Sequence, residues 1–454
     1  MSDWTKTTLV DIADITMGQS PKSEYYNLDG EGLPFLQGSA EFDSMYPVFK
    51  KHTSEWNREA PKNSILMSVR APVGALNIAP IRCAIGRGLA SIRGKNDNTA
   101  FLYYLLKYSE RRLNDQSSGT VFTAINKKGL ENFIVYIPPI SEQKAIAHIL
   151  GTLDDKIELN RRQNETLEAM AQALFKSWFV DFDPVLDNAL AAGNTIPPAL
   201  QKKAAQRQAV ADEKKLLAKN PALAQLFPAS FEFNEELGKW VPEGWEVKPF
   251  GELIEKTIGG DWGKEVPDDK HTEPARIIRG TDIPKILKHD ASAAPLRFVE
   301  KKKLETRKLE IGDLVVEVSG GSPTQPTGRA LLIDKNILKR LGGQAEPASF
   351  CRRMKPLKVE YSSFCYAHLL LMYDTGRMWE YQVQSTGIAN FQTNFFLETE
   401  QVLIPADPNL LADFHKRAKA FRERTTLDQI DILTSIREAL LPMLLSGKIT
   451  INAK

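Results

Sequence analysis

The sequence has few residues that could cross-link the chain or hold it in a membrane. It contains three cysteines, Cys83, Cys351 and Cys365, which lie far apart and are odd in number. That pattern argues against a disulfide framework and against a structural zinc site. No apolar run approaches the roughly 18 residues of a transmembrane helix, and residues 1–10 lack the apolar region of a signal peptide. We therefore predict a soluble, cytoplasmic protein.

Motifs for cofactor chemistry are also missing. The segment Gly259–Lys264 is followed by Glu265, so it lacks the spacing of a phosphate-binding loop. No Gly-x-Gly-x-x-Gly unit for a nucleotide or S-adenosylmethionine occurs, and the Asn-Pro-Pro-aromatic element of amino-methyltransferases is absent. The six histidines have no ligand spacing. We predict that the chain has no catalytic residues, binds no metal and holds no cofactor of its own.

One pair of segments loosely resembles a nuclease metal site. Pro267-Asp268 and Glu300-Lys301-Lys302 have the residue types of a Pro-Asp…Glu-x-Lys arrangement. Because the chain has 57 acidic residues and many lysines, such a match arises easily by chance. A self-sufficient nuclease or methyltransferase is the alternative, which Mg²⁺ or labelled S-adenosylmethionine with the isolated protein would test.

The most regular feature is a heptad pattern over residues 146–179. Steps of four and three residues alternate along it, which is the spacing of a helix that faces a partner helix. Two asparagines lie in this stripe, where a polar pair would fix the register. Ser141, after Pro138-Pro139, is a candidate N-cap. The stripe consists of Ile146, Leu150, Leu153, Ile157, Asn160, Asn164, Leu167, Ala171, Leu174 and Trp178.

A second apolar stripe near the C-terminus repeats the end of the first. Leu167 and Phe179 are matched by Leu433 and Leu445, and both pairs are 266 residues apart (433 − 167 and 445 − 179). We predict that the two helices pair antiparallel, although residues 422–429 break the phase of the second stripe. The residues expected at the helix–helix contact are Ile157, Asn160, Asn164, Leu167, Leu174, Trp178, Leu433, Ile436, Leu440 and Leu444.

Other parts of the chain repeat as well. Trp4 and Gly18 are matched by Trp245 and Gly259, both at an offset of 241 (245 − 4 and 259 − 18). Ser118-Gly119-Thr120 resembles Thr386-Gly387-Ile388, at a larger offset. The drift indicates insertions in the second copy, which loops tolerate. Each copy is therefore predicted to be a globular unit followed by a long helix.

The predicted fold class is α+β, with two similar β-rich units separated by two long helices that pair as an antiparallel coiled coil, in a pseudo-twofold repeat. In the first unit, short strands are expected at residues 35–36, 64–69, 75–78, 89–92 and 133–137, with a helix at Thr99–Arg112. A charged helix is expected around Lys202–Lys219. The predicted segments are 1–138 (first unit), 139–182 (first long helix), 183–240 (connector), 241–405 (second unit) and 406–454 (second long helix and C-terminal tail).

Polar and cationic loops occupy matching places in the two globular units. The chain has 59 basic and 57 acidic residues, so a nucleic-acid-binding face must come from local clustering. Each loop alone is more simply a solvated turn, but matched clusters favour a shared anionic ligand over a pure coiled-coil scaffold. A salt-dependent DNA shift would exclude the scaffold. The loop residues predicted to bind DNA are Gln19, Ser20, Lys22, Gln37, Arg70, Lys127, Lys264, Arg279, Gln325, Arg329, Arg352 and Gln392.

Five segments carry a resemblance to a known family. They are Ala173–Pro184, Ile137-Pro138-Pro139 with the following Glu142–Ile146, Val241–Trp245, Met17–Pro21 and Ser64–Gly74. Together they resemble the central helix and the domain starts of the specificity subunits of type I restriction-modification enzymes, and the resemblance covers essentially the whole chain.

The resemblance implies a non-catalytic, DNA-binding subunit that takes part in DNA methylation and phage defence. Its two target-recognition domains would each read one half of a split, asymmetric site in double-stranded DNA, and the long helices would fix the spacer. Two copies of a methyltransferase subunit would dock on the helix–helix residues named above, and motor-nuclease subunits would join them. S-adenosylmethionine, ATP and Mg²⁺ are expected on those partners, and no membrane is involved.

Overall fold

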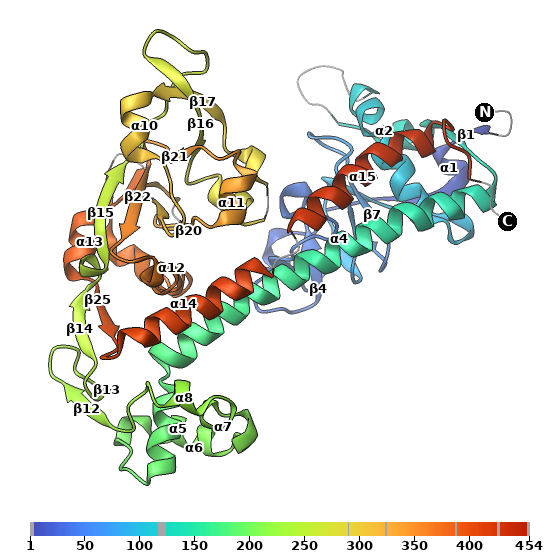
Figure 1. Ribbon diagram of the computed structural model, residues 1–454. Coiled ribbons are helices and arrows are strands. Elements are labelled where there is room, and N and C mark those ends of the chain that lie inside the picture. The colour runs from blue at the N-terminus through green and yellow to red at the C-terminus, as the bar shows by residue number, and fades with distance from the viewer. Residues whose placement is uncertain are drawn as a thin grey trace. The chain divides into compact units, whose positions relative to one another are not determined.

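The chain is an α+β protein whose residues group into two units. The computed structural model describes residues 4–116, 124–288, 290–322, 325–385, 388–424 and 427–451. Unit 1 contains residues 1–162 and 426–454, and unit 2 contains residues 163–425. The long helix α4 (Ile140–Phe175) contributes residues to both units (Figure 1). Among the described helices, none is long and apolar enough to cross a membrane.

Unit 1 contains two main sheets. The first has the order β2–β10–β7–β8 with antiparallel neighbours. The second has the order β3–β5–β4–β9–β6, and its β4–β9 pair is parallel. Strands β1 and β11 form a separate antiparallel pair. The strands are β1 (Thr5–Thr8), β2 (Ala13–Met17), β3 (Tyr26–Asn27), β4 (Leu33–Leu36), β5 (Lys51–Thr53), β6 (Glu59–Ala60), β7 (Ile65–Ser68), β8 (Leu76–Ile78), β9 (Cys83–Ile85), β10 (Leu89–Gly94) and β11 (Ile134–Ile137).

The core of unit 1 lies between its four-stranded sheet and three helices. Helix α2 (Thr99–Gln116) buries Phe101 and Leu105, as its apolar spacing predicts. The same core includes Ile146 of α4 and Leu444 of α15 (Leu427–Leu445). Burying one such side chain contributes roughly 1.5–3 kcal/mol. The shorter helices are α1 (Leu9–Ile12) and α3 (Lys127–Glu131).

Unit 2 is also built on a four-stranded sheet, with the order β15–β22–β18–β20. In chain order this is first, fourth, second and third, as in the β2–β10–β7–β8 sheet of unit 1. A second sheet, β17–β16–β21, again contains one parallel pair. The strands are β12 (Phe231–Asn234), β13 (Lys239–Pro242), β14 (Glu246–Pro249), β15 (Ile254–Gly259), β16 (His271–Ile278), β17 (Leu296–Glu300), β18 (Leu314–Glu317), β19 (Ser319–Gly320), β20 (Ala330–Leu332), β21 (Ala345–Pro347), β22 (Cys351–Pro356), β23 (Gln382–Ser385), β24 (Ile388–Phe391) and β25 (Gln401–Ile404).

Aromatic side chains dominate the main core of unit 2. Phe175 and Phe179 pack against Phe364 and Phe414, with ring centres 5.1 to 5.9 Å apart. Such pairs add about 0.5–1.5 kcal/mol beyond the area that they bury. The helices of this part are α9 (Ile283–Leu287), α10 (Lys301–Arg307), α11 (Lys335–Arg340), α12 (Ser362–Asp374), α13 (Thr393–Thr399) and α14 (Pro408–Glu423).

The long helices differ from the predicted pair in one respect. Helix α4 covers the expected span and continues as a π-helical turn, Lys176–Val180. Where one second helix was predicted over 406–454, the structure has two, α14 ending at Glu423 and α15 starting at Leu427. Helix α14 ends and α15 starts within residues 422–429, the segment in which the apolar stripe of the sequence loses its phase.

The connector forms several short helices where one charged helix was predicted. They are α5 (Asp183–Ala192), α6 (Gln201–Gln208), α7 (Leu216–Lys219) and α8 (Pro221–Ala224). Arg207 of α6 forms an ion pair with Asp187 of α5, which is buried. This ion pair holds α6 against α5. The prediction of one helix around Lys202–Lys219 is wrong, because α6 ends at Gln208 and α7 starts at Leu216.

Candidate nucleic-acid interface

Four loop segments of unit 1 meet just beyond the ends of its strands. We call residues 18–20, 37–38, 69–70 and 86–88 the first loop cluster. A Cβ on Gly18, Gly86 or Gly88 would come within 3.0 Å of neighbouring backbone atoms, so the close approach requires glycine. The backbone hydrogen bonds that join the segments run from Gly18 N to Leu89 O (2.8 Å), Gln19 N to Ile85 O (3.0 Å), Gly86 N to Leu36 O (2.8 Å), Gly88 N to Gln37 O (3.1 Å) and Val69 N to Gly88 O (2.9 Å).

Ser20 organises the side chains of the first loop cluster. Gln37 Nε2 donates a hydrogen bond to Ser20 Oγ at 2.8 Å, and the backbone N–H of Arg87 donates to the same oxygen at 3.2 Å. The Gln37 amide is thereby held in place although its side chain is exposed. The Gln19 and Arg87 side chains are exposed beside it. An anchored amide offers both a donor and an acceptor, which is the combination that matches the edge of adenine.

Two further cations lie at or near this cluster. Arg70 is exposed and pairs with Ala124 as an isolated β-bridge, and Ile125 N donates to Val69 O at 3.0 Å. Lys127 follows at the start of α3, where it forms an exposed ion pair with Glu131 (3.5 Å). Such surface pairs contribute at most about 1 kcal/mol, so a phosphate could compete for this lysine.

The corresponding segments of unit 2 meet in the same way. We call residues 260–262, 279–280, 318–319 and 348–350 the second loop cluster. Its backbone hydrogen bonds run from Gly260 N to Cys351 O (3.3 Å), Asp261 N to Pro347 O (3.1 Å), Ala348 N to Ile278 O (2.8 Å) and Val318 N to Phe350 O (2.9 Å).

Each of these four bonds has a counterpart in unit 1, and the offset between counterparts is constant within a loop segment but differs between segments. The Gln19–Ile85 and Asp261–Pro347 bonds are related by 242 and 262 residues (261 − 19 and 347 − 85). The Gly86–Leu36 and Ala348–Ile278 bonds are related by the same two offsets (278 − 36 and 348 − 86). The Val69–Gly88 and Val318–Phe350 bonds are related by 249 and 262 residues (318 − 69 and 350 − 88). Positions 20, 37, 70, 87 and 88 thus correspond to 262, 279, 319, 349 and 350.

The side chains at the corresponding positions are different. Trp262 stands where unit 1 has Ser20, and its side chain is 40% exposed. The guanidinium carbons of Arg297 and Arg279 lie 5.2 and 6.0 Å from the centre of its ring, which are cation–π contacts. Phe350, in the place of Gly88, is 62% exposed. The second cluster therefore offers aromatic surface where the first offers a hydroxyl and an amide.

Two arginines predicted to bind DNA are fixed by buried carboxylates. Nε and Nη2 of Arg279 donate to Asp282 at 2.8 and 2.6 Å, which raises the pKa of the arginine. Its side chain remains 41% exposed. Arg329 donates in the same two-pronged way to Glu317, at 2.8 and 2.5 Å, and is mostly buried. Arg279 can therefore present a positioned guanidinium to a ligand, whereas the Arg329 guanidinium is engaged inside the unit.

The other predicted residues are spread more widely. Gln392, next to Phe391, lies near the second cluster because Phe391 N donates to Val318 O (2.8 Å). Lys264 is exposed on a segment whose backbone pairs with Phe298. Gln325 closes a turn with Ser322, and Arg352 lies partly exposed on β22. In unit 1, Lys22 forms an exposed ion pair with Glu24 at 3.4 Å. The roles of these residues in DNA binding stay predictions.

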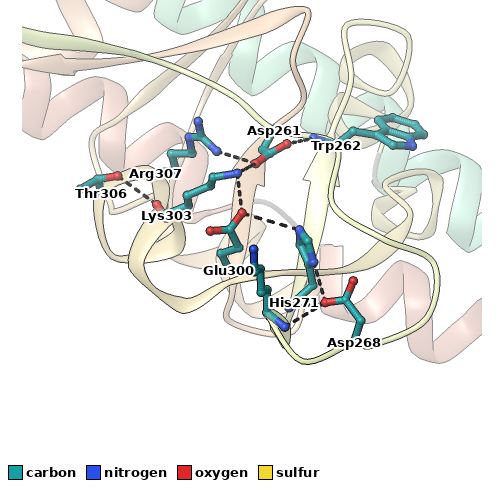
Figure 2. Close-up of polar contacts among 9 residues, drawn as sticks. Asp261, Trp262, Asp268, His271, Glu300, Lys303, Thr306 and Arg307 are labelled. Carbon is teal, nitrogen blue, oxygen red and sulfur yellow. Dashed lines mark hydrogen bonds and ion pairs between the residues drawn. The ribbon is translucent and has the colours of Figure 1, made fainter.

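The segments that loosely resemble a nuclease site come together, but their carboxylates have basic partners (Figure 2). His271 Nδ1 lies 2.7 Å from Asp268, and its Nε2 lies 3.7 Å from Glu300. Lys303 Nζ lies 2.7 Å from Glu300 and 3.2 Å from Asp261. Hydrogen bonds from the backbone and ring of His271 lower the pKa of Asp268 to about 2. Within the described ranges, no three His, Cys, Asp or Glu side chains are placed to hold a metal ion.

Helix α4 contacts α15 within unit 1. Arg437 lies within 2.5 Å of Asp154, which also accepts a hydrogen bond from Tyr104 Oη at 2.8 Å. Ile157 packs with Ile430 and Leu433, and Asn160 Nδ2 lies 3.4 Å from the amide oxygen of Gln429. The partner number falls as the α4 number rises, so these two segments run in opposite directions. Leu440 and Leu444 belong to the core of unit 1, whereas Ile436 is 42% exposed.

The end of α4 contacts α14 within unit 2. Trp178 packs on Phe414, and Arg417 lies over the indole ring at 5.9 Å. Leu174 packs against the same core, and Asn164 is buried nearby on α4. Leu167 is partly buried. The predicted stripe of α4 is therefore used by two different helices, one in each unit.

Sequence reasoning missed three residues of the loop clusters. Arg87, Trp262 and Phe350 were not among the predicted contacts, because neither cluster is continuous in sequence. The available signal was local: Gly260-Asp261-Trp262 is the segment that corresponds to Gly18-Gln19-Ser20, one residue later than the offset of 241 predicted from the sequence. The exposed side chains of both clusters are of the types that contact phosphates and base edges in nucleic-acid interfaces.

Known proteins that resemble this chain are DNA specificity proteins. Residues 1–169 match the family described as the type I restriction modification DNA specificity domain. The putative type I restriction enzyme MjaX specificity subunit of Methanocaldococcus jannaschii is 46% identical over 34% of this chain, an alignment that spans 37% of that relative. The MjaIX specificity subunit of the same organism is 25% identical over 99% of this chain and 94% of its own length.

One solved structure extends the likeness in fold over nearly the whole chain. The S subunit of a type I restriction-modification system from M. genitalium covers 97% of this chain and 96% of its own length, with a TM-score of 0.50 and 16% identity. Residues 1–169 therefore match a type I restriction modification DNA specificity domain, and the chain is similar to a type I specificity subunit over nearly its whole length.

Proposed function

We propose that this chain is the DNA-recognition subunit of a type I restriction-modification complex and that each loop cluster reads one half of a bipartite, asymmetric site. The observation that carries the proposal is the matched set of backbone hydrogen bonds in the two clusters. One backbone frame is used twice with different exposed side chains, which suits two short sequences that differ from each other. The names of the relatives, all specificity subunits, support the same role.

The two units are, in this proposal, copies of one ancestral unit with a target-recognition domain in each. The shared strand order and the matched hydrogen bonds support it. The counterparts Ser118-Gly119-Thr120 and Thr386-Gly387 lie outside the described residues, so they add no support.

Binding affinity and base selectivity have different sources in this scheme. Arg70, Arg87 and Lys127 would release counterions from the phosphates, which makes affinity depend on salt. Gln37 and Arg279 would contact base edges, and a good bidentate contact contributes roughly 1–3 kcal/mol of discrimination. The chain itself would carry out no chemistry.

The long helices would act as the frame that separates the half-sites and receives the partner subunits. We propose that α4 pairs antiparallel with α15 and α14 as a coiled coil, and that two methyltransferase subunits dock on it. Motor-nuclease subunits would join through them. S-adenosylmethionine, ATP and Mg²⁺ would bind to those partners.

A mobility-shift experiment with the full chain tests the DNA-binding role. The chain, with its methyltransferase subunit, should shift duplex DNA at low salt, and its affinity should fall steeply as salt rises. If no duplex is shifted at low salt, the proposed function is wrong.

A four-residue insertion after Asn160 tests the frame. It lengthens the helix by about 6 Å, which is less than two base pairs at roughly 3.4 Å each. The spacer of the methylated motif should then change, while both half-sites stay as they are. An unchanged spacer would refute the role of the helices as a ruler.

A further inference from the structure

The two loop clusters place chemically unlike side chains on one backbone frame. Gln37 directly follows β4 of unit 1, and Arg279 directly follows β16 of unit 2. Each of these strands has a parallel neighbour in its sheet. Gln37 is exposed, and the Arg279 side chain is 41% exposed. Each is anchored by a neighbouring side chain, Gln37 by Ser20 and Arg279 by Asp282. An exposed side chain that is held in one orientation can discriminate between bases, because little rotamer entropy is lost on binding.

The hydrogen-bonding capacity of these two anchored groups is different. Gln37 Nε2 donates to Ser20 Oγ at 2.8 Å and Ser20 Oγ donates to Gln37 Oε1 at 3.0 Å. The second N–H of Nε2 and the second lone pair of Oε1 remain for a ligand, and the adenine edge requires one donor and one acceptor. Arg279 uses Nε and Nη2 for Asp282, and Nη2 also donates to Ala293 O at 3.1 Å. In the part of the chain that the structure describes, Nη1 has no hydrogen-bond partner, so it is a donor available to a ligand. A donor-only group matches the N7 and O6 acceptors of guanine.

The side chains beside Arg279 reinforce the difference. Trp262 lies against its guanidinium, and Phe350 exposes most of an apolar ring in the place of Gly88. Apolar side chains in DNA interfaces contact the thymine methyl group. In unit 1 the same two positions hold Ser20 and Gly88, which offer no such surface.

We propose that Gln37 in unit 1, and Arg279 with Phe350 in unit 2, are the specificity-determining residues of the two half-sites. Gln37 selects an adenine. Arg279 selects a guanine, and Phe350 favours a thymine beside it. This inference rests on the proposed function and deepens it, since it assigns base preferences to named positions.

Selection from duplexes randomised at both half-sites, with the chain bound to its methyltransferase subunit, tests the assignment. R279Q should lower the preference for guanine at one position of the second half-site by on the order of tenfold or more. F350S should relax the preference for thymine at a neighbouring position. The first half-site, read by the unchanged unit 1, should be the same in both variants and serves as an internal reference.

A charge-matched control separates base reading from general affinity. K302Q also removes one positive charge from an exposed side chain of unit 2, so any loss of affinity should be uniform across sequences. Because R279Q leaves Asp282 without its cation, F350S decides the matter if R279Q does not fold; the Phe350 side chain is exposed.

The outcomes distinguish the two levels of the argument. Altered preferences in the second half-site alone support the assignment. Variants that fold and select the wild-type half-sites overturn it, and the proposed function stands. A wild-type complex that selects no sequence in either half overturns the proposed function, and this inference with it.

Discussion

Helix α4 makes two contacts of opposite chemical character. In unit 1 its middle meets α15 through the Asp154–Arg437 ion pair, the Asn160–Gln429 contact and a small apolar cluster around Ile157, beyond the apolar core that Ile146 shares with Leu444. In unit 2 it meets α14 through aromatic rings. Burial of rings supplies stability, whereas a buried charge pair contributes little net stability but penalises any other partner or register. The comparison teaches that a uniform heptad pattern can hide two different interfaces.

Removing one ring of the aromatic interface should have the largest effect. Phe414 is fully buried and contacts Phe175, Trp178 and Phe179. F414A should lower the free energy of unfolding of unit 2 by about 3–5 kcal/mol, because it leaves a cavity. Denaturant unfolding measures this loss. I432A, at a side chain that is 59% exposed, is the control and should cost less than about 0.5 kcal/mol.

Breaking the Asp154–Arg437 ion pair of unit 1 should lower the free energy of unfolding slightly less than F414A does. Unlike that loss, it should be recovered when apolar residues replace both partners. R437A leaves Asp154, which is 6% exposed, without its cation, and should destabilise unit 1 by roughly 3 kcal/mol. The double variant D154L/R437M should recover much of that loss, since apolar residues replace the pair. R162A, which breaks the exposed pair with Glu158, should cost less than about 1 kcal/mol. Equal losses for R437A and R162A would contradict a buried, register-fixing pair.

A buried carboxylate that unit 1 lacks should make unit 2 sensitive to pH. Glu346 corresponds to Ala84 (346 − 262) and is fully buried, and burial raises its pKa to about 7 from 4.5. Because the folded chain keeps this proton to a higher pH than the unfolded chain, stability is full below pH 4.5 and falls as pH rises to 7.

The variant E346Q tests this pH dependence. It should stabilise unit 2 at pH 8 by on the order of 2 kcal/mol and flatten the pH profile between 4.5 and 7. Thermal unfolding across that range is the measurement. A wild-type profile that is already flat would show that Glu346 does not titrate in the folded chain.

The smallest expected effect is on DNA affinity. R70A should weaken binding about equally for all sequences and reduce the slope of log K against log salt by roughly 1. R329A is not its equivalent in unit 2, because it would leave the buried Glu317 without its partner. If R70A alters neither affinity nor sequence preference, the placement of Arg70 at the DNA is wrong.

Regular patterns made part of this structure predictable. The apolar spacing of residues 99–112 and the heptads of 146–179 predicted α2 and α4, because a helix buries one face. The break in phase at 422–429 left the pairing register of the second helix open, and α14 ends and α15 starts within it. The heptad stripe of residues 146–179 could not reveal that α4 contacts two helices, because any apolar residue, leucine or phenylalanine, satisfies the heptad spacing.

The candidate site was harder to predict than the fold. Ser20 and Gln37 were identified as loop residues, but their hydrogen bond depends on glycines 86 and 88, far away in the chain. Arg329 has the residue type of a phosphate contact, yet Glu317 engages it. Arg87 and Phe350 carry no motif and become candidates only when backbone hydrogen bonds bring their loops together.

The most direct test of two unlike reading units is the methylation pattern that the chain directs. DNA from a host that expresses the chain with its methyltransferase subunit should carry methylated adenine in a motif of two short, different sequences at a fixed separation. Methylation confined to one continuous sequence, or identical with and without this chain, would contradict the account.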